Sequence, residues 1–242
     1  HLLRPSDGTI PERIAFIQCV GSRDSNCGND YCSSICCMYA TKEAIIAKEH
    51  VHFAKPTIFY MDVRAYGKGF DAYYERAKTE YGVRFIKCMV SKVRDQLKTK
   101  NLLLMYLNGE GKIEEEEFEL VVLSVGVVPS KGTMEMAKRV GVELDAYGFC
   151  KTRPFAPTST SKPGIYVCGA FQGPKDIPET VSQASGAVAD ATAKIAQARG
   201  TIATKKEYPV ESDVAAEEPR IGVFVCHCGI NIGGVVNVPS VK

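Results

Sequence analysis

The sequence predicts an α/β protein built around a doubly wound parallel sheet. Apolar runs bounded by Pro or Gly, which are typical of buried strands, lie at 13–22, 56–67 and 83–95. Segments whose apolar residues recur at helical spacing lie between them, at 33–49 and 69–82. Because strands that alternate with helices form parallel sheets covered by those helices, this order indicates a doubly wound domain.

Each predicted helix has a start or stop signal. We expect Ser33 or Ser34 to cap the first helix, since a serine hydroxyl can accept a hydrogen bond from a first-turn N–H group. We expect Gly82 to end the second helix, because glycine readily adopts the left-handed conformation that often follows a helix.

A hairpin is predicted at 101–126. Its turn is the sequence NGEG at 108–111, and it leads into the strand FELVVLSVG. The acidic run Glu114–Glu117 is interpreted as a solvated strand end. Together with the preceding strands and helices, this hairpin completes a Rossmann-like domain that we place at residues 1–125.

The chain changes character after residue 125. Residues 126–200 contain a short predicted helix at 133–141, a predicted strand at 164–171 and a long Ala-rich helix at 177–200. Residues 201–219 are polar and charged without a clear period, and are interpreted as a linker. The chain does not begin with Met, and we expect it to be a piece of a longer polypeptide.

The composition limits the classes of function. The net charge of +2 gives no indication of a nucleic-acid partner or an acidic membrane. No apolar run approaches the roughly 18–20 residues of a membrane-spanning helix. The ten cysteines are the outlier, and in a chain that is neither small nor evidently secreted they indicate metal or redox chemistry rather than a disulfide framework. We therefore expect a cytoplasmic location.

The first strand-to-helix turn carries an unusual loop. In a doubly wound fold this turn normally has the sequence G-x-G-x-x-G and binds a dinucleotide phosphate. Here the sequence CVGSRDSNCGNDYCSSICC takes its place, with thiols at five positions: Cys19, Cys27, Cys32, Cys36 and Cys37. The phosphate-binding glycines have thus been replaced by cysteines.

Several chemistries could use such a loop. Iron–sulfur clusters are held by four cysteine thiolates, and a helix start favours thiolate over thiol, so we favour a cluster. A zinc site is an alternative, although the usual repeated spacing of zinc ligands is missing. A redox-active disulfide, or a set of buried and unreactive cysteines, would also account for thiols at these positions.

The remaining five cysteines give weaker signals. Three of them are isolated in the sequence and are interpreted as core residues: Cys88, Cys150 and Cys168. Cys226 and Cys228 flank a histidine and are candidate metal ligands.

The motifs RPSDG, RIAFIQCVGSRD and YCSSICCMYATKEA closely resemble those of the heterodisulfide reductase A subunit, a family of flavin and iron–sulfur proteins. The resemblance extends over nearly all of residues 1–200. It implies a thioredoxin-reductase-like flavoprotein core with one [4Fe–4S] cluster on four cysteines: Cys19, Cys32, Cys36 and Cys37. Cys27 matches the family pattern less well and is not among these ligands.

The same resemblance organises the rest of the chain. It implies that residues 126–200 are the returning part of an FAD-binding domain. The tail sequence RIGVFVCHCGINIGGVVNV resembles the beginning of the same kind of subunit, so 220–242 is expected to open a further domain of this type with a strand–turn unit.

A second motif concerns the flavin. The sequence GIYVCGAFQGPKDIPETVSQASG resembles the second flavin motif of disulfide-reductase flavoproteins, but Gly169 is followed by Ala170 where that motif has an Asp. The resemblance implies that the next helix begins near Pro178, with the Thr180 amide facing flavin O2 and Glu179 beside it. No G-x-G-x-x-G loop for the other half of FAD occurs in the sequence, so the site would be completed outside this chain.

These observations predict an electron-transfer module that passes electrons between FAD, which bifurcates electron pairs in the family, and iron–sulfur clusters. The resemblance implies partners within such a complex: cluster-bearing subunits and a hydrogenase or dehydrogenase. A homodimer is a further candidate assembly. An NAD(P)H-dependent disulfide reductase is the alternative enzyme. It would need a phosphate loop, a C-x-x-C pair facing the flavin and a pair of basic residues for the NADP phosphate. The sequence has neither the loop nor the C-x-x-C pair, and Arg64 is the one basic residue of the pair that remains. A zinc-binding scaffold without a redox role is the third hypothesis.

Overall fold

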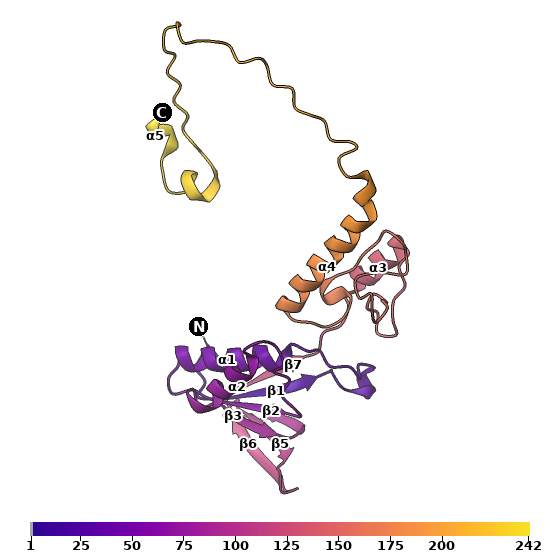
Figure 1. Cartoon of the computed structure of the whole chain (residues 1–242). Helices are drawn as coiled ribbons and strands as arrows, with labels where there is room; N and C mark the ends of the chain where they lie inside the picture. The colour runs from indigo at the N-terminus through magenta and orange to yellow at the C-terminus, as the bar shows by residue number, and fades with distance from the viewer. Residues whose placement is uncertain (1) are drawn as a thin grey trace. The chain divides into compact units, whose positions relative to one another are not determined.

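The computed structural model describes residues 2–242 and divides into two units, one ending at Arg199 and the other spanning Gly200–Lys242 (Figure 1). The first unit is built on a parallel sheet of four strands in the order β3-β2-β1-β7. Their bounds are β1 Arg13–Val20, β2 Lys55–Tyr60, β3 Arg84–Lys87 and β7 Leu120–Val125. The predicted Rossmann-like α/β fold is confirmed, because every neighbouring pair in this sheet is parallel.

A second, antiparallel sheet consists of β4 (Val90–Asp95), β5 (Leu102–Leu107) and β6 (Ile113–Phe118). The predicted hairpin is confirmed as the β5–β6 pair. The single strand predicted at 83–95 is wrong, because the chain leaves the parallel sheet at Cys88 and then enters the antiparallel one. The Cys88 amide donates to the carbonyl of Tyr60 at 2.9 Å, the last backbone bond of the segment to β2.

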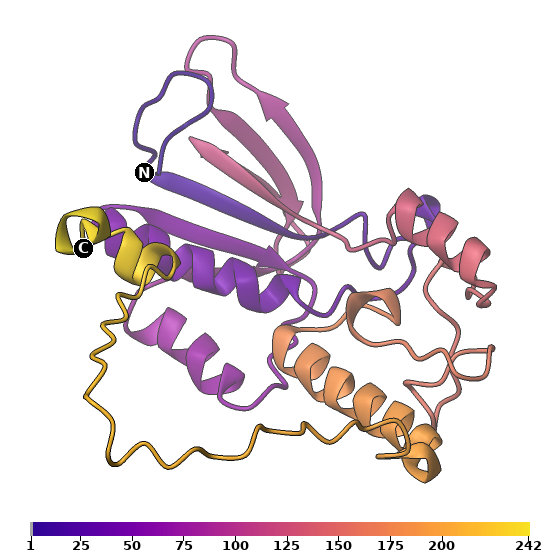
Figure 2. The ribbon, with the colours of Figure 1, turned by 90° about the horizontal axis from the view of Figure 1, so that it is seen from above.

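The strands bury both faces of the parallel sheet. Ile14 and Ile58 face one core, together with helices α1 (Cys36–His50) and α2 (Phe70–Thr79). Phe59, the next residue along β2, faces the opposite core with Leu104 and Phe118 of the antiparallel sheet. Figure 2 shows the two helices together on one side of the parallel strands. This alternation follows from the two-residue period of a strand and explains why the strand segments are apolar throughout.

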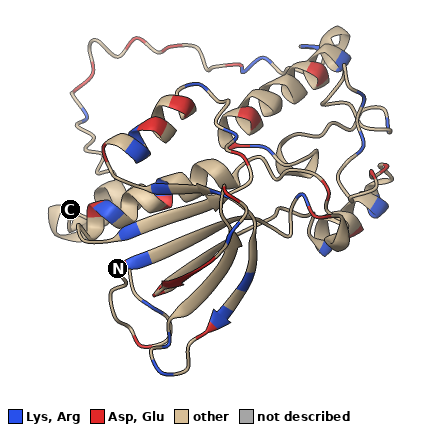
Figure 3. Cartoon of the chain, turned by 90° about the horizontal axis from the view of Figure 1, so that it is seen from below, with Lys and Arg blue, Asp and Glu red and all other residues tan. Residues whose placement is uncertain are grey.

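The interpretation of the acidic run on β6 as a solvated strand end fits the exposed Glu114 and Glu115 but is wrong for Glu116. The Glu116 side chain is 14% exposed and accepts hydrogen bonds from both Arg13 and Arg84. Figure 3 shows acidic residues in red gathered on one strand of the antiparallel sheet. Arg13 and Arg84 open β1 and β3, so Glu116 connects the antiparallel sheet to the amino end of the parallel one. That edge is opposite the one from which the cysteine loop leaves.

The rest of the first unit contains two helices and little sheet. Helix α3 (Lys131–Val140) is capped by Ser130, and α4 (Ile177–Ile195) runs into a 3₁₀ turn at Ala196–Ala198. The strand predicted at 164–171 is wrong: Tyr166 makes an isolated bridge with Ser159, and Gly169–Phe171 form a 3₁₀ turn.

The second unit has no β-strand among its residues, so the strand predicted to begin at 220 is wrong. It contains a π-helical turn at Gly229–Gly233 and a short helix, α5 (Val238–Val241). The second unit begins at Gly200, where the Ala-rich helix predicted at 177–200 ends. Within residues 2–242, no helix combines the length and apolar character needed to cross a bilayer.

Candidate functional site

The cysteine loop leaves β1 at the carboxyl edge of the parallel sheet and ends where α1 begins at Cys36. In doubly wound folds, this edge is where ligands bind. Within the loop, Ser25–Cys27 form a 3₁₀ turn capped by the Asp24 side chain. The loop therefore lies where the sequence predicts the site to be.

Cys36 contacts two of the other predicted cluster ligands, Cys19 and Cys37. Hydrogen bonding with Cys36 lowers the pKa of Cys19 to about 7 and that of Cys37 to about 6. The same bonds to Cys19 and Cys37 raise the pKa of Cys36. Cys36 and Cys37 are only 2% and 6% exposed, so the group is closed to water on the helix side. Cysteines from the end of β1 and the start of α1 thus bring their sulfur atoms together, with the lowest thiol pKa values next to the helix start.

Cys32, the fourth predicted ligand, and Cys19 both interact electrostatically with the same cation, Arg23. Burial alone would lower the pKa of Arg23. The nearby negative charge of Asp62, followed by those of Cys19 and Cys32, outweighs burial, so the pKa of Arg23 is raised overall. The Cys32 sulfur also accepts a hydrogen bond from the Ser34 amide at 3.3 Å. Arg23 therefore provides positive charge beside two of the four thiols.

Cys27 has a different environment from the other loop cysteines. Its side chain is exposed, and its thiol donates to Asp24 Oδ2 at 3.3 Å. That hydrogen bond raises the pKa of Cys27. The thiol is thus held by a carboxylate of its own turn.

The backbone of the loop is strained at the residues that aim the sulfurs. Among residues 2–242, positive φ at residues other than glycine occurs at four positions: Cys19 (59°), Arg23 (57°), Ser34 (64°) and Lys100 (57°). Three of the four are in this loop. The pairing of β1 with β7 also shifts register between Ile17 and Val20. Such strain persists only when surrounding contacts fix it, and it is concentrated at functional sites in proteins.

Two serines fix the loop from inside. The Ser33 hydroxyl donates to Ser22 Oγ at 3.0 Å and accepts a hydrogen bond from the Val127 amide at 2.8 Å. The Ser22 hydroxyl in turn donates to the Tyr31 carbonyl at 3.0 Å. The predicted capping of α1 by Ser33 or Ser34 is wrong, since Ile35 is the N-cap residue and no side chain caps the helix.

The thiols of the loop contact one another but are not arranged as a preformed metal site. Within residues 2–242, no group of three or more His, Cys, Asp or Glu side chains is already arranged to hold a metal ion. The chemistry of the donor set nevertheless favours one kind of group. Four thiols, three of them in contact and two with lowered pKa, fit the all-thiolate ligation of an iron–sulfur cluster.

The predicted flavin motif brings Gly169 against the first turn of α4. Gly169 has φ of +72°, and a Cβ there would lie 3.2 Å from Thr180 Cγ2, so the position requires glycine. Its amide donates to Gln183 Oε1 at 2.9 Å. Ala170, which follows, is exposed. Two of the predicted flavin residues, Gly169 and Thr180, are therefore neighbours.

The start of α4 is capped by its own residues. Asp176 and Glu179 form a reciprocal capping box, with Asp176 Oδ1 accepting from the Glu179 amide at 2.8 Å. The Thr180 amide donates to the Asp176 carbonyl at 3.0 Å, and Pro178 has no N–H to offer. The flavin contacts expected of Glu179 and Thr180 stay a prediction, since both groups already have partners within the helix.

Lys175 is a residue of this motif that sequence reasoning missed. Its ammonium donates to the carbonyls of Gly169 (3.0 Å) and Gly173 (2.8 Å) and to Gln172 Oε1 (2.9 Å). Burial lowers the pKa of Lys175. The only sequence signal was a lysine in the turn GPKD before a predicted helix, which does not reveal a cation folded back onto Gly169.

A comparison with protein families decides the wider assignment. Residues 27–191 match the model of the family described as pyridine nucleotide-disulphide oxidoreductase. The chain belongs to this family. The predicted thioredoxin-reductase-like fold and oxidoreductase class agree with that membership.

Relatives of this oxidoreductase confirm the resemblance to the heterodisulfide reductase A subunit. It is 45% identical over 200 residues to the iron-sulfur A subunit of CoB–CoM heterodisulfide reductase from Methanocaldococcus jannaschii, covering 81% of this chain and 30% of that protein. It is 46% identical over 190 residues to the A subunit of the H₂/formate:CoB-CoM heterodisulfide, ferredoxin reductase from Methanococcus maripaludis, covering 77% and 29%. The H₂-dependent counterpart from Methanothermobacter thermautotrophicus is 40% identical over 232 residues, covering 93% and 34%. The chain thus spans about a third of the length of these relatives.

At the end of β2, where a reductase of the alternative type would hold the NADP phosphate, the basic side chains are already paired with an acidic one. Arg64, the one basic residue at the end of β2, lies 3.5 Å from Asp62, and Asp62 also pairs with Arg23 at 2.7 Å. Both cations near the strand end therefore share one carboxylate, which holds them within the protein without cancelling their combined charge.

The remaining cysteines of the oxidoreductase lie in different environments. Cys150 is buried, and burial raises the pKa of the half-buried Cys88 to about 11, as expected of core thiols. Cys168 is exposed, so its interpretation as a core residue is wrong. In the second unit, the sulfurs of Cys226 and Cys228 lie 3.1 Å apart and both residues are exposed.

Proposed function

We propose that this chain is an electron-transfer module from the A subunit of a heterodisulfide-reductase-type complex, carrying one [4Fe–4S] cluster on Cys19, Cys32, Cys36 and Cys37. The observation that carries the proposal is the contact of the Cys36 thiol with those of Cys19 and Cys37, at the edge of the sheet where a phosphate loop is expected. The similarity to relatives named as iron-sulfur subunits supports it.

The chain's own residues would perform three tasks at this site. The burial of Cys36 and Cys37 limits access of water to the thiols. Arg23, close to Cys19 and Cys32, offsets the negative charge that accumulates when four thiols ionise together. The strained backbone at Cys19 and Ser34 fixes the directions of the ligands. When bound, a cluster supplies one-electron transfer and FAD supplies one- and two-electron transfer.

We propose that the FAD site is formed only in part by this chain, at Gly169, Ala170 and the start of α4 with Pro178, Glu179 and Thr180. The positive φ of Gly169 and its close approach to Thr180 fix this turn against the first turn of α4, which supports a preformed half-site. The second half of the site, which would bind the FAD pyrophosphate, would come from a longer polypeptide. Electron-pair bifurcation would require that complete site.

The partners would be other subunits of such a complex. Relatives are named as subunits of H₂- or formate-dependent heterodisulfide reductases, which supports cluster-bearing subunits and a hydrogenase or dehydrogenase as partners, in the cytoplasm. A second copy of the chain is the further candidate.

The cluster assignment is tested by anaerobic reconstitution with iron and sulfide. We expect about four irons per chain and an electron paramagnetic resonance signal after reduction. Ser replacements of Cys19, Cys32, Cys36 or Cys37 should abolish or convert that cluster. Cys27→Ser and Cys88→Ser are the matched controls and should retain it.

Two results would contradict the proposal. One is an intact four-iron signal in the Cys36→Ser and Cys37→Ser variants. The other is stoichiometric zinc, with no iron, in protein purified without oxygen, which would favour the zinc-binding scaffold.

A further inference from the structure

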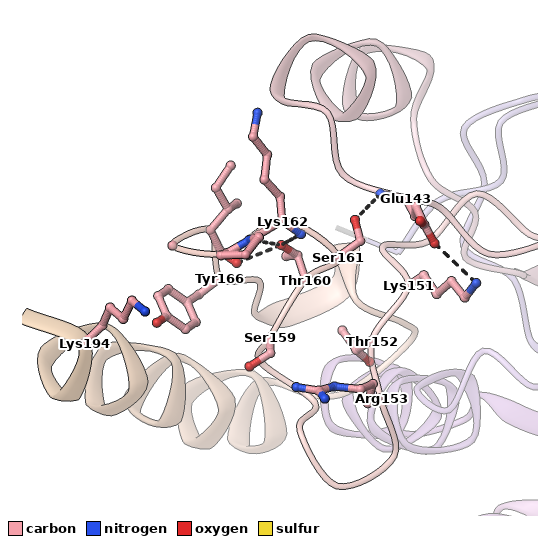
Figure 4. Close-up of a pocket in the computed structure, with 13 residues that line it drawn as sticks. Glu143, Lys151, Thr152, Arg153, Ser159, Thr160, Ser161, Lys162, Tyr166 and Lys194 are labelled. Carbon is pink, nitrogen blue, oxygen red and sulfur yellow. Dashed lines mark hydrogen bonds and ion pairs between the residues drawn. The ribbon is translucent and has the colours of Figure 1, made fainter.

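A cavity of about 480 Å³ lies in the segment after α3. It is lined by residues of two stretches, 151–153 and 159–166, together with Glu143 and with Lys194 of α4 (Figure 4). None of its lining residues belongs to the cysteine loop or to the predicted flavin residues. Its volume is in the range of pockets that bind small molecules.

The charge of this cavity is mainly positive. Four cations line it, and Glu143 is the one carboxylate among the lining residues. Lys151 lies 3.3 Å from Glu143, and the Lys162 ammonium donates to the Val140 carbonyl at 2.8 Å. The side chains of Arg153 and Lys194 have no hydrogen-bond or ion-pair partner within residues 2–242. Two cations that face the cavity are therefore uncompensated.

Some hydroxyl groups of the cavity are hydrogen-bonded within the described residues, and others have no partner there. Thr160 donates to the Ile165 carbonyl at 2.8 Å, and Ser161 accepts from the Glu143 amide at 2.9 Å, so both hold the loop together. The hydroxyls of Ser159 and Tyr166 have no partner in the described part of the chain. These two residues face each other across an antiparallel bridge.

The four free groups come from separate elements and lie along the cavity in two pairs. Figure 4 shows Arg153 and Ser159 pointing toward each other, and Lys194 of α4 pointing toward Tyr166. All four can donate hydrogen bonds, and two of them carry positive charge. A planar guanidinium matches the oxygens of a phosphate with paired hydrogen bonds, while an ammonium and hydroxyls satisfy the remaining oxygens.

We propose that this cavity binds the phosphate group of a small phosphorylated organic molecule, through Arg153, Ser159, Tyr166 and Lys194. A phosphate dianion has enough acceptor oxygens for all four donors. The cavity is larger than inorganic phosphate needs, so the rest of it would hold the organic part of the ligand. The inference does not depend on the proposed electron-transfer function.

The test is isothermal titration of the full chain with ribose 5-phosphate and with inorganic phosphate, at constant ionic strength set by chloride. We expect saturable binding of ribose 5-phosphate with a dissociation constant of about 1 mM or below, and weaker binding of inorganic phosphate. Ribose without phosphate should not bind. Arg153→Gln and Lys194→Gln should each weaken binding by about tenfold, since each removes a charge-assisted hydrogen bond.

The controls separate recognition from general positive charge. Arg139→Gln removes an exposed arginine of α3 that does not line the cavity and should leave the affinity unchanged. Arg153 and Lys194 are exposed, so their variants should keep the wild-type circular dichroism and thermal midpoint.

Several results would overturn the inference. They are the absence of saturable binding at millimolar ribose 5-phosphate, an equal loss of affinity in Arg139→Gln, and equal affinity for inorganic phosphate. Binding of an acidic peptide without binding of either phosphate would instead identify the cavity as a protein-docking surface and would also overturn it.

Discussion

The Tyr31 hydroxyl donates a hydrogen bond to the Val127 carbonyl at 2.8 Å, across 96 positions of sequence. Because Ser33 accepts from the amide of the same residue, the cysteine loop binds both backbone polar groups of Val127. The Tyr31 ring also makes edge contacts with Tyr147 and Phe149, at centroid distances of 4.7 and 5.5 Å. The candidate cluster loop is thus attached to the chain segment that leads toward the predicted flavin residues.

Tyr31→Phe tests this attachment. The variant keeps the ring contacts but leaves the Val127 carbonyl without its donor, so we expect a loss of about 1–2 kcal/mol in the free energy of unfolding. Urea denaturation measures it. Tyr73→Phe is the matched control, because the Tyr73 hydroxyl has no hydrogen-bond partner within residues 2–242 and its loss should change little. Equal effects of the two variants would show that the Val127 bond contributes nothing.

Gly126→Ala tests the close approach of the β7 end to the loop. A Cβ at Gly126 would lie 2.8 Å from the Gly21 carbonyl oxygen and 3.0 Å from Ser22 Cβ, so backbone would have to move. We expect a loss of about 1–3 kcal/mol in unfolding free energy. The iron content after reconstitution should fall as well.

Gly109→Ala is the control for that variant. Gly109 lies in the turn of the β5–β6 hairpin, where an added Cβ meets nothing within 4 Å. Its stability and iron content should equal those of the wild type. If Gly126→Ala also matched the wild type, the end of β7 would not be what positions the loop.

We predict that the chain does not bind NADH or NADPH with a dissociation constant tighter than about 10 μM, or about −7 kcal/mol. The reasons are the replaced glycine loop and the pairing of Arg64 and Arg23 with Asp62. Isothermal titration of the chain with each nucleotide measures the affinity. Tighter binding would favour the alternative of an NAD(P)H-dependent disulfide reductase.

We predict that the 242-residue chain does not retain stoichiometric FAD through gel filtration. The pyrophosphate of FAD is normally held at a glycine loop and helix start, and the sequence has no G-x-G-x-x-G loop. A longer polypeptide that includes such a strand–turn–helix should elute yellow. Retention of one FAD per molecule by this chain alone would show that the half-site interpretation is mistaken.

The sequence predicts the parallel sheet and its helices well because their signals are local. Apolar residues at a period of two or 3.6 persist whatever the partner element is. The strand predicted at 83–95 fails for the converse reason: β-forming residues continue through Cys88, but nothing local says that the two halves join different sheets. The interpretation of Glu116 as solvated fails in the same way, since its two arginine partners lie 103 and 32 positions away.

The candidate site also has features with a local sequence signal and features that depend on tertiary contacts. The types and spacing of the cysteines indicate their chemistry, and Cys19, Cys36 and Cys37 do come together. The positive φ at Cys19 and the bonds from Ser33 and Tyr31 to Val127 depend on tertiary structure, so the sequence gives no sign of them. Lys175 was missed because a surface turn and a folded-back cation have the same local sequence.

The bonds to Val127 also determine when the ligand loop can take its shape during synthesis. The residue that holds Tyr31 and Ser33 is made 96 and 94 positions later than those two residues themselves. Until β7 has left the ribosome and joined β1, the thiols are on an unrestrained segment, because contacts distant in sequence form only after the intervening chain is ordered. Cluster insertion into this loop would therefore follow, rather than guide, the folding of the sheet, and nascent chains would expose oxidisable thiols throughout that interval.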